Sequence, residues 1–89
     1  MKKVTIYTTD YCGYCSRAKS ILQKEGVPFE EKDVSADAAA RQWLVDVTGR
    51  RTVPQIFFDE EPIGGCDDLE KLVKKGELKA RLEGQAAPA

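Results

Sequence analysis

Two cysteines stand where an extended segment gives way to a helical one. The apolar run 4–7 precedes the segment Cys12-Gly13-Tyr14-Cys15, and apolar residues at helical spacing, at 18, 21 and 22, follow it. The pair therefore lies at a strand-to-helix junction. Because side chains three positions apart share one face of a helix, the two sulfurs can approach each other and form a disulfide. This junction restricts the chain to folds in which a strand leads directly into a helix.

The two thiols are not equivalent in this position. Cys12 is expected at the helix cap, where free backbone N–H groups and the positive end of the helix dipole stabilise a thiolate. Cys15 lies one turn further and is expected to be shielded. We interpret Cys12 as the nucleophile and Cys15 as the resolving thiol. The alternative is half of a zinc site, but zinc takes four ligands, and the sequence has no histidine and only one further cysteine, Cys66.

The composition is that of a small globular domain. The chain has 89 residues, of which 42% are hydrophobic and 33% charged. A net charge of −1 with mixed signs offers no basic surface for nucleic acid and no charged run for a membrane. The N-terminus lacks the apolar region of a signal peptide, and no segment is long enough to span a bilayer, so we expect a cytoplasmic protein. In a reducing cytoplasm a CxxC pair is more often catalytic or metal-binding than structural.

The hydrophobic periodicity predicts alternating strands and helices. Strands are expected at 3–8, 29–34 and 55–58 and around Ile63, and helices at about 13–25, 35–49, 67–76 and 78–82. The first three elements form a βαβ unit, and the turn before Ile63 is short enough to require antiparallel pairing. Caps are expected at Ser35 and at Asp67, the latter with Glu70 in a capping box. Trp43 is expected to be buried or half-buried. The domain is expected to span 1–83, with 84–89 as a flexible tail.

Two other segments are candidates for a binding role. In Thr52-Val53-Pro54, the proline forces Val53 into an extended conformation. A cis bond there would let Val53 offer its main chain to a peptide, and the alternative is a strand that simply begins with proline. In Gly64-Gly65-Cys66-Asp67-Asp68, the glycines let a ligand approach the backbone at a helix N-terminus. The alternative here is a turn followed by a helix cap, with Cys66 as a small buried residue.

Taken together, three segments resemble one family. Cys12-Gly13-Tyr14-Cys15, Thr52-Val53-Pro54-Gln55 and Gly64-Gly65-Cys66-Asp67-Asp68-Leu69 are similar, in this order, to the dithiol glutaredoxins of the small bacterial type. The resemblance implies an α/β, thioredoxin-like fold, with a four-stranded mixed β-sheet flanked by three or four α-helices and a cis Val53–Pro54 bond. It also implies an oxidoreductase that reduces protein–glutathione mixed disulfides and protein disulfides, with glutathione as its co-substrate.

The resemblance assigns roles to individual residues. Cys12 would attack the glutathione sulfur of a mixed disulfide, and Cys15 would resolve protein disulfides. The implied glutathione site consists of Tyr14, Arg41, Thr52, Val53, Pro54, Gly65, Cys66 and Asp67, with Arg51 as a weaker candidate. Within it, Asp67 would bind the γ-glutamyl ammonium group and Arg41 the glycyl carboxylate. The expected partners are glutathione and glutathionylated or disulfide-containing proteins, and we expect a monomer without a metal site of its own.

Two positions depart from the common family pattern. Gly13 stands where many dithiol members have proline, and Thr9 stands where many have a lysine that would steady the Cys12 thiolate. Glycine restores an N–H near the sulfur and loosens the turn. This leaves a second hypothesis open, in which two chains hold a [2Fe–2S] cluster through two copies of Cys12 and two glutathione thiols. A third possibility is a glutaredoxin-like protein that thioredoxin reductase reduces.

Overall fold

The computed structural model describes residues 2–83, so the expected tail at 84–89 lies outside the described residues. The described part contains the elements β1 (Val4–Thr8), α1 (Gly13–Lys24), β2 (Glu30–Asp33), α2 (Ala38–Thr48), β3 (Gln55–Phe58), β4 (Glu61–Gly64), α3 (Cys66–Lys74) and α4 (Leu78–Leu82). All eight predicted elements are therefore present, with ends within a few residues of those expected. Across residues 2–83, no helix combines the length and the apolar character needed to cross a bilayer.

The strands form one mixed sheet in the order β2-β1-β3-β4. The pair β1–β2 is parallel, with Thr5 opposite Glu30, because α1 carries the chain back between them. The pairs β1–β3 and β3–β4 are antiparallel. The predicted four-stranded mixed sheet is confirmed, as is the antiparallel pairing across the short turn before β4.

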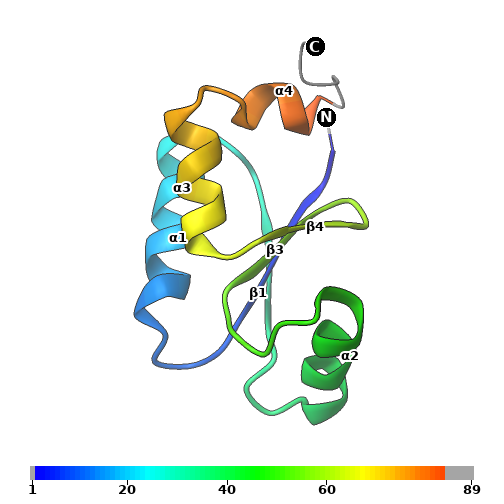
Figure 1. Cartoon of the computed structure of the whole chain (residues 1–89). Helices are drawn as coiled ribbons and strands as arrows, with labels where there is room; N and C mark the ends of the chain where they lie inside the picture. The colour runs from blue at the N-terminus through cyan, green and yellow to red at the C-terminus, as the bar shows by residue number, and fades with distance from the viewer. Residues whose placement is uncertain (1, 84–89) are drawn as a thin grey trace.

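Helices cover the two faces of the sheet unequally. Figure 1 shows α1 and α3 side by side on one face and α2 alone on the other. Because side chains alternate along a strand, Ile6 and Ile56 enter the larger core under α1 and α3, while Phe57 enters a smaller core under α2. The larger core also contains Leu22, Leu69 and Leu82, and the smaller one Val34 and Leu44. Both β1 and β3, which carry the site segments at their ends, are thus fixed from both sides.

The indole of Trp43 closes the outer edge of the smaller core. It is 45% exposed, and its ring stacks on Phe57 with the ring centroids 5.6 Å apart. The prediction of a half-buried packing residue is confirmed. In the same helix, Gly49 has the left-handed φ of 73° that ends α2, as its place after the helical pattern predicts.

The two predicted helix caps are wrong. Asp37 caps α2 by accepting the N–H of Ala40 at 2.9 Å, whereas the hydroxyl of Ser35 accepts the N–H of Asp10 from another loop. At α3 the cap residue is Gly65, and Asp68 accepts its N–H at 3.0 Å. Asp67 instead belongs to the first turn. Each helix start offers several short acceptors in sequence, and contacts with distant segments select among them.

Candidate active site

Cys12 occupies the N-cap of α1. Its backbone is extended, and its sulfur accepts the N–H of Cys15 at 3.1 Å, so the sulfur lies where the helix presents its free N–H groups. The preceding Tyr11 has a φ of 55°, which turns the chain sharply between β1 and the helix. Partly exposed, Cys12 is also a free thiol. The predicted cap position of this cysteine is confirmed.

Cys15 lies in a different environment only three residues later. It is a free thiol with 2% of its surface exposed. Burial raises the pKa of Cys15 to about 12, and a hydrogen bond with Cys12 acts in the same direction. The buried thiol therefore stays protonated at neutral pH, whereas the sulfur of Cys12 meets solvent and helix N–H groups. This difference suits an attacking thiol at Cys12 and a reserve thiol at Cys15.

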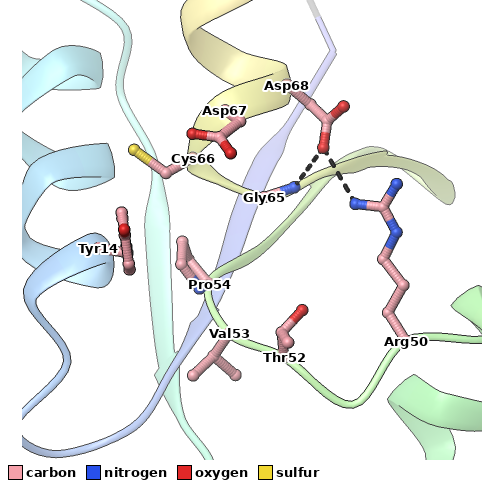
Figure 2. Close-up of a pocket in the computed structure, with 9 residues that line it drawn as sticks. All are labelled: Tyr14, Arg50, Thr52, Val53, Pro54, Gly65, Cys66, Asp67 and Asp68. Atoms are coloured by element: carbon pink, nitrogen blue, oxygen red, sulfur yellow. Dashed lines mark hydrogen bonds and ion pairs between the residues drawn. The ribbon is translucent and has the colours of Figure 1, made fainter.

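A pocket of about 320 Å³ has in its wall Tyr14, which lies between the two cysteines in sequence. Figure 2 shows its walls, which come from the first turn of α1, the loop before β3 and the first turn of α3. The lining residues are Tyr14, Arg50, Thr52, Val53, Pro54, Gly65, Cys66, Asp67 and Asp68. Cys12 is linked to this pocket through Val53, because its thiol lies 3.8 Å from the Val53 carbonyl oxygen. A molecule in the pocket would thus lie within reach of the Cys12 sulfur.

Two loops meet at the floor of the pocket. The Val53–Pro54 bond is cis, as the family resemblance implied. A Cβ atom added to Gly65 would lie 3.3 Å from the carbonyl oxygen of Pro54, so a glycine allows the close approach of these two backbones. Backbone groups of both loops are therefore available to an extended ligand lying between them.

A hydrogen-bonded group fixes the far wall of the pocket. One carboxylate oxygen of Asp68 accepts the N–H of Gly65 and the guanidinium of Arg50, both at 3.0 Å, as drawn in Figure 2. Burial alone would raise the pKa of Asp68, but the Gly65 N–H and the Arg50 guanidinium outweigh it and hold this pKa below its usual value. The site thus contains an ionised carboxylate and a fixed cation on one side.

Cys66 faces the pocket as a protonated thiol. Its residue is 4% exposed, and its sulfur lies 3.5 Å from a carboxylate oxygen of Glu70, which in turn pairs with Arg17 at 2.7 Å. Burial raises the pKa of Cys66, and the hydrogen bond to the Glu70 carboxylate raises it further. Cys66 therefore acts here as a small buried residue, as the simpler interpretation of the sequence held.

The structure gathers all of the residues that the resemblance assigned to the glutathione site except Arg41 and the weaker candidate Arg51. Tyr14, Thr52, Val53, Pro54, Gly65, Cys66 and Asp67 all line the pocket. Arg41 is not among the lining residues, because its guanidinium donates to the carbonyl oxygens of Val34 and Ser35 at 2.7 and 2.6 Å. Sequence reasoning missed Arg50 and the role of Asp68. A carboxylate three residues after a glycine that opens a helix was the available signal for Asp68.

The chain is similar to known proteins over nearly its whole length. The sequence model of the family described as Glutaredoxin matches residues 4–63. Glutaredoxin 3 of Escherichia coli K12 is 47% identical over 83 residues, which cover 93% of this chain and all of the relative. The solution structure of glutaredoxin from Brucella melitensis has a TM-score of 0.86 at 42% identity, covering 98% and 96% of the two chains. A buckwheat glutaredoxin–glutathione complex has a TM-score of 0.85 at 31% identity, covering 97% and 83%.

Proposed function

This chain belongs to the glutaredoxin family of thiol–disulfide oxidoreductases, and we propose that glutathione is its co-substrate. The observation that carries the proposal is the position of Cys12 next to the pocket. Its sulfur lies 3.8 Å from the carbonyl oxygen of Val53, a residue that lines the pocket. A disulfide bound with its sulfur beside Cys12 would place the rest of a tripeptide between the two loops. The similar buckwheat protein is described as a complex with glutathione.

In the proposed reaction the Cys12 thiolate attacks the glutathione sulfur of a protein–glutathione mixed disulfide. The S–S bond breaks, the protein thiolate leaves and takes up a proton, and glutathione remains on Cys12 as a new mixed disulfide. A second glutathione thiolate then releases the first as glutathione disulfide. Protein disulfides follow a second route, in which Cys12 attacks the protein disulfide and Cys15 then attacks Cys12 and releases the reduced protein. Two glutathiones reduce the resulting Cys12–Cys15 disulfide and leave as glutathione disulfide. Helix N–H groups at the Cys12 sulfur stabilise its thiolate in each step.

We propose that the two ends of glutathione bind to opposite parts of the pocket. The main chains of Thr52 and Val53 would pair with the tripeptide backbone in strand-like fashion. The first turn of α3 would receive the γ-glutamyl end, with the exposed Asp67 on the ammonium group and helix N–H groups on the carboxylate. For the glycyl carboxylate we propose no cation, because Arg41 does not line the pocket and Arg50 is paired with Asp68 at the start of α3.

The test is turnover of hydroxyethyl disulfide with NADPH and two alternative reducing systems. With glutathione and glutathione reductase, we expect NADPH oxidation that rises with glutathione concentration and saturates. With thioredoxin reductase alone, we expect none. Turnover supported by thioredoxin reductase, and not by glutathione, would overturn the proposal. It would favour the alternative of a glutaredoxin-like protein that thioredoxin reductase reduces.

We also propose that two chains can hold a [2Fe–2S] cluster between them, and the open space around Gly13 supports this second proposal. A Cβ atom added to Gly13 meets nothing within 4 Å, and the neighbouring Tyr11 and Tyr14 are exposed on the surface around Cys12. A second chain could therefore approach this surface, and Gly13→Pro removes the N–H and the freedom of the turn that glycine provides here. Anaerobic reconstitution with iron, sulfide and glutathione should give a coloured dimer that Gly13→Pro weakens. A colourless monomer would contradict the proposal.

A further inference from the structure

A polar cluster joins three elements behind the first helix. The hydroxyl of Thr8, at the end of β1, donates to a carboxylate oxygen of Glu31 at 2.8 Å. Lys19 of α1 donates to both carboxylate oxygens of Glu31, at 3.2 and 3.1 Å. Thr8 is only 1% exposed, so its hydroxyl fixes the Glu31 side chain from the protein interior. The ammonium group of Lys19 is thus held in one place rather than left to move in solvent.

The Lys19–Glu31 pair differs from the other lysine–glutamate pair along this edge of the sheet. The side chains of Lys19 and Glu31 are 30% and 37% exposed, against 68% and 47% for the pair Lys3–Glu30. Charges interact more strongly where water is partly excluded. A pair held in this way has an electrostatic effect on its neighbours that the exposed pair lacks.

Cys15 is such a neighbour. Lys19 follows Cys15 by four residues on α1, which places both side chains on one face of the helix. Burial raises the pKa of Cys15, as do the hydrogen bond and the charge from Cys12, whereas the Thr9 backbone and the Lys19 ammonium lower it. Once Cys12 is in a mixed disulfide, it carries no negative charge. Burial then remains to raise the pKa of Cys15, and the Thr9 backbone and the Lys19 ammonium oppose it.

We propose that Lys19, oriented by Glu31 and Thr8, is a positioning residue that stabilises the thiolate of Cys15 while it attacks the mixed disulfide on Cys12. The inference rests on the roles proposed above for these two cysteines, but not on the use of glutathione. Charged groups of β2 also take part, since Glu31 offsets some of the Lys19 charge and Asp33 responds to the same ammonium group. Thr8 keeps the Glu31 carboxylate drawn to the β1 side.

The step is balanced without a further reactant. The Cys15 thiol gives up its proton, and its sulfur attacks the Cys12 sulfur. The bond between Cys12 and the substrate thiol breaks, a Cys12–Cys15 disulfide forms, and the leaving thiolate takes up a proton from water in exchange for the one released. The lysine keeps its own proton throughout and supplies only a fixed positive charge.

The experiment follows this single step with hydroxyethyl disulfide as the oxidant. Reduced protein is mixed with excess oxidant and quenched with acid at successive times. Mass spectrometry then separates the protein that carries mercaptoethanol from the protein that has formed its internal disulfide. The rate of conversion is measured against pH for the unchanged protein, Lys19→Met, Lys19→Arg and the control Lys3→Met, which removes a lysine from the exposed pair. Methionine retains the apolar stem of lysine.

We expect Lys19→Met to slow internal disulfide formation about threefold at neutral pH, because less of Cys15 is then thiolate, and the greater nucleophilicity of a more basic sulfur offsets only part of that loss. Its rate–pH profile should move to higher pH, Lys19→Arg should restore most of the rate, and Lys3→Met should have no effect. An unchanged rate and profile in Lys19→Met would overturn the inference. Failure to form the mercaptoethanol adduct in every protein would instead refute the nucleophilic role of Cys12.

Discussion

The first turns of α1 and α3 satisfy their backbone N–H groups in opposite ways. At α1 the acceptor is the sulfur of the cap residue itself, since Cys12 takes the N–H of Cys15 at 3.1 Å. At α3 the cap is Gly65, and the acceptor comes from inside the helix, where Asp68 reaches back to the Gly65 N–H at 3.0 Å. The capping atom of α1 is thus the candidate reacting atom, while the capping carboxylate of α3 is also tied to Arg50.

In the first turn of each helix, two neighbouring side chains have different roles. Cys12 is partly exposed and Cys15 buried; Asp67 is exposed at the pocket and Asp68 is bound into the wall. In each turn one group is left for a ligand or substrate, and its neighbour is held by the fold. Replacing each of the four side chains in turn tests this division of roles.

Replacing Cys12 should have the largest effect. Cys12→Ser should abolish reduction of both mixed disulfides and protein disulfides, because a serine hydroxyl cannot form the intermediate disulfide. Serine is a good N-cap residue, so α1 should remain folded. The measurement is the coupled NADPH assay, with the thermal unfolding curve as a control of folding. Activity above about a tenth of the original would remove Cys12 from the nucleophilic role.

Replacing Cys15 should separate the two reactions. Cys15→Ser should keep reduction of small glutathione mixed disulfides, because a second glutathione can release the first from Cys12. It should lose about nine-tenths or more of the reduction of protein disulfides such as those of insulin, because no internal thiol completes that reaction. Both rates are measured on one preparation. If Cys15→Ser instead loses mixed-disulfide reduction together with protein reduction, Cys15 is the attacking thiol and the two cysteines have exchanged roles.

Replacing Asp67 should weaken binding more than chemistry. Asp67→Ala is expected to raise the KM for a glutathionylated peptide about fivefold with kcat nearly unchanged, because Asp67 would bind ground state and transition state alike. Glu60→Ala, in the exposed turn between β3 and β4, removes the same charge away from the pocket and should leave KM as it is. Equal KM values for the original protein and Asp67→Ala would limit Asp67 to a structural role.

Replacing Asp68 should chiefly lower stability. Asp68→Asn is expected to cost about 1 kcal/mol of unfolding free energy at pH 7, because it weakens a charged hydrogen bond at a helix start. The pKa of Asp68 lies below its usual value in the folded protein, so its stabilising effect is present above an unfolded pKa of about 3.9. That effect is lost as the pH falls through the folded pKa. Denaturant unfolding at pH 7 and pH 3 should therefore show a difference between the two proteins that shrinks in acid.

A constant difference between pH 7 and pH 3 would contradict this account of Asp68. Asp67→Asn is the matched control, since it makes the same chemical change one residue away, at an exposed position outside the cap. It should change the unfolding free energy less than Asp68→Asn at neutral pH. A larger loss of unfolding free energy from Asp67→Asn would mean that Asp67, the cap residue predicted from the sequence, stabilises the start of α3 more than Asp68 does.

The helices, the strands and the positions of the two cysteines could be predicted from local sequence. The strands and helices follow from apolar residues at a spacing of two or of about 3.6, and these local signals survive in the folded protein because each apolar face is buried. Cys12 and Cys15 are only three residues apart, so their places at the cap and one turn inside the helix also depend on local geometry. The thioredoxin-like fold class was instead implied by the resemblance of three segments to one family, and these local signals supplied its first βαβ unit.

The contacts between polar side chains depend instead on the packing of distant segments. Arg50 and Asp68 are eighteen positions apart, and they form a pair because the loop before β3 lies against the start of α3. The hydroxyl of Ser35 accepts the N–H of Asp10 and therefore does not cap α2. The guanidinium of Arg41 donates to the carbonyl oxygens of Val34 and Ser35. Long polar side chains and short acceptors can each choose among several partners, and local sequence scarcely distinguishes them. The packing of distant segments makes that choice, because it fixes which partner lies within hydrogen-bonding distance.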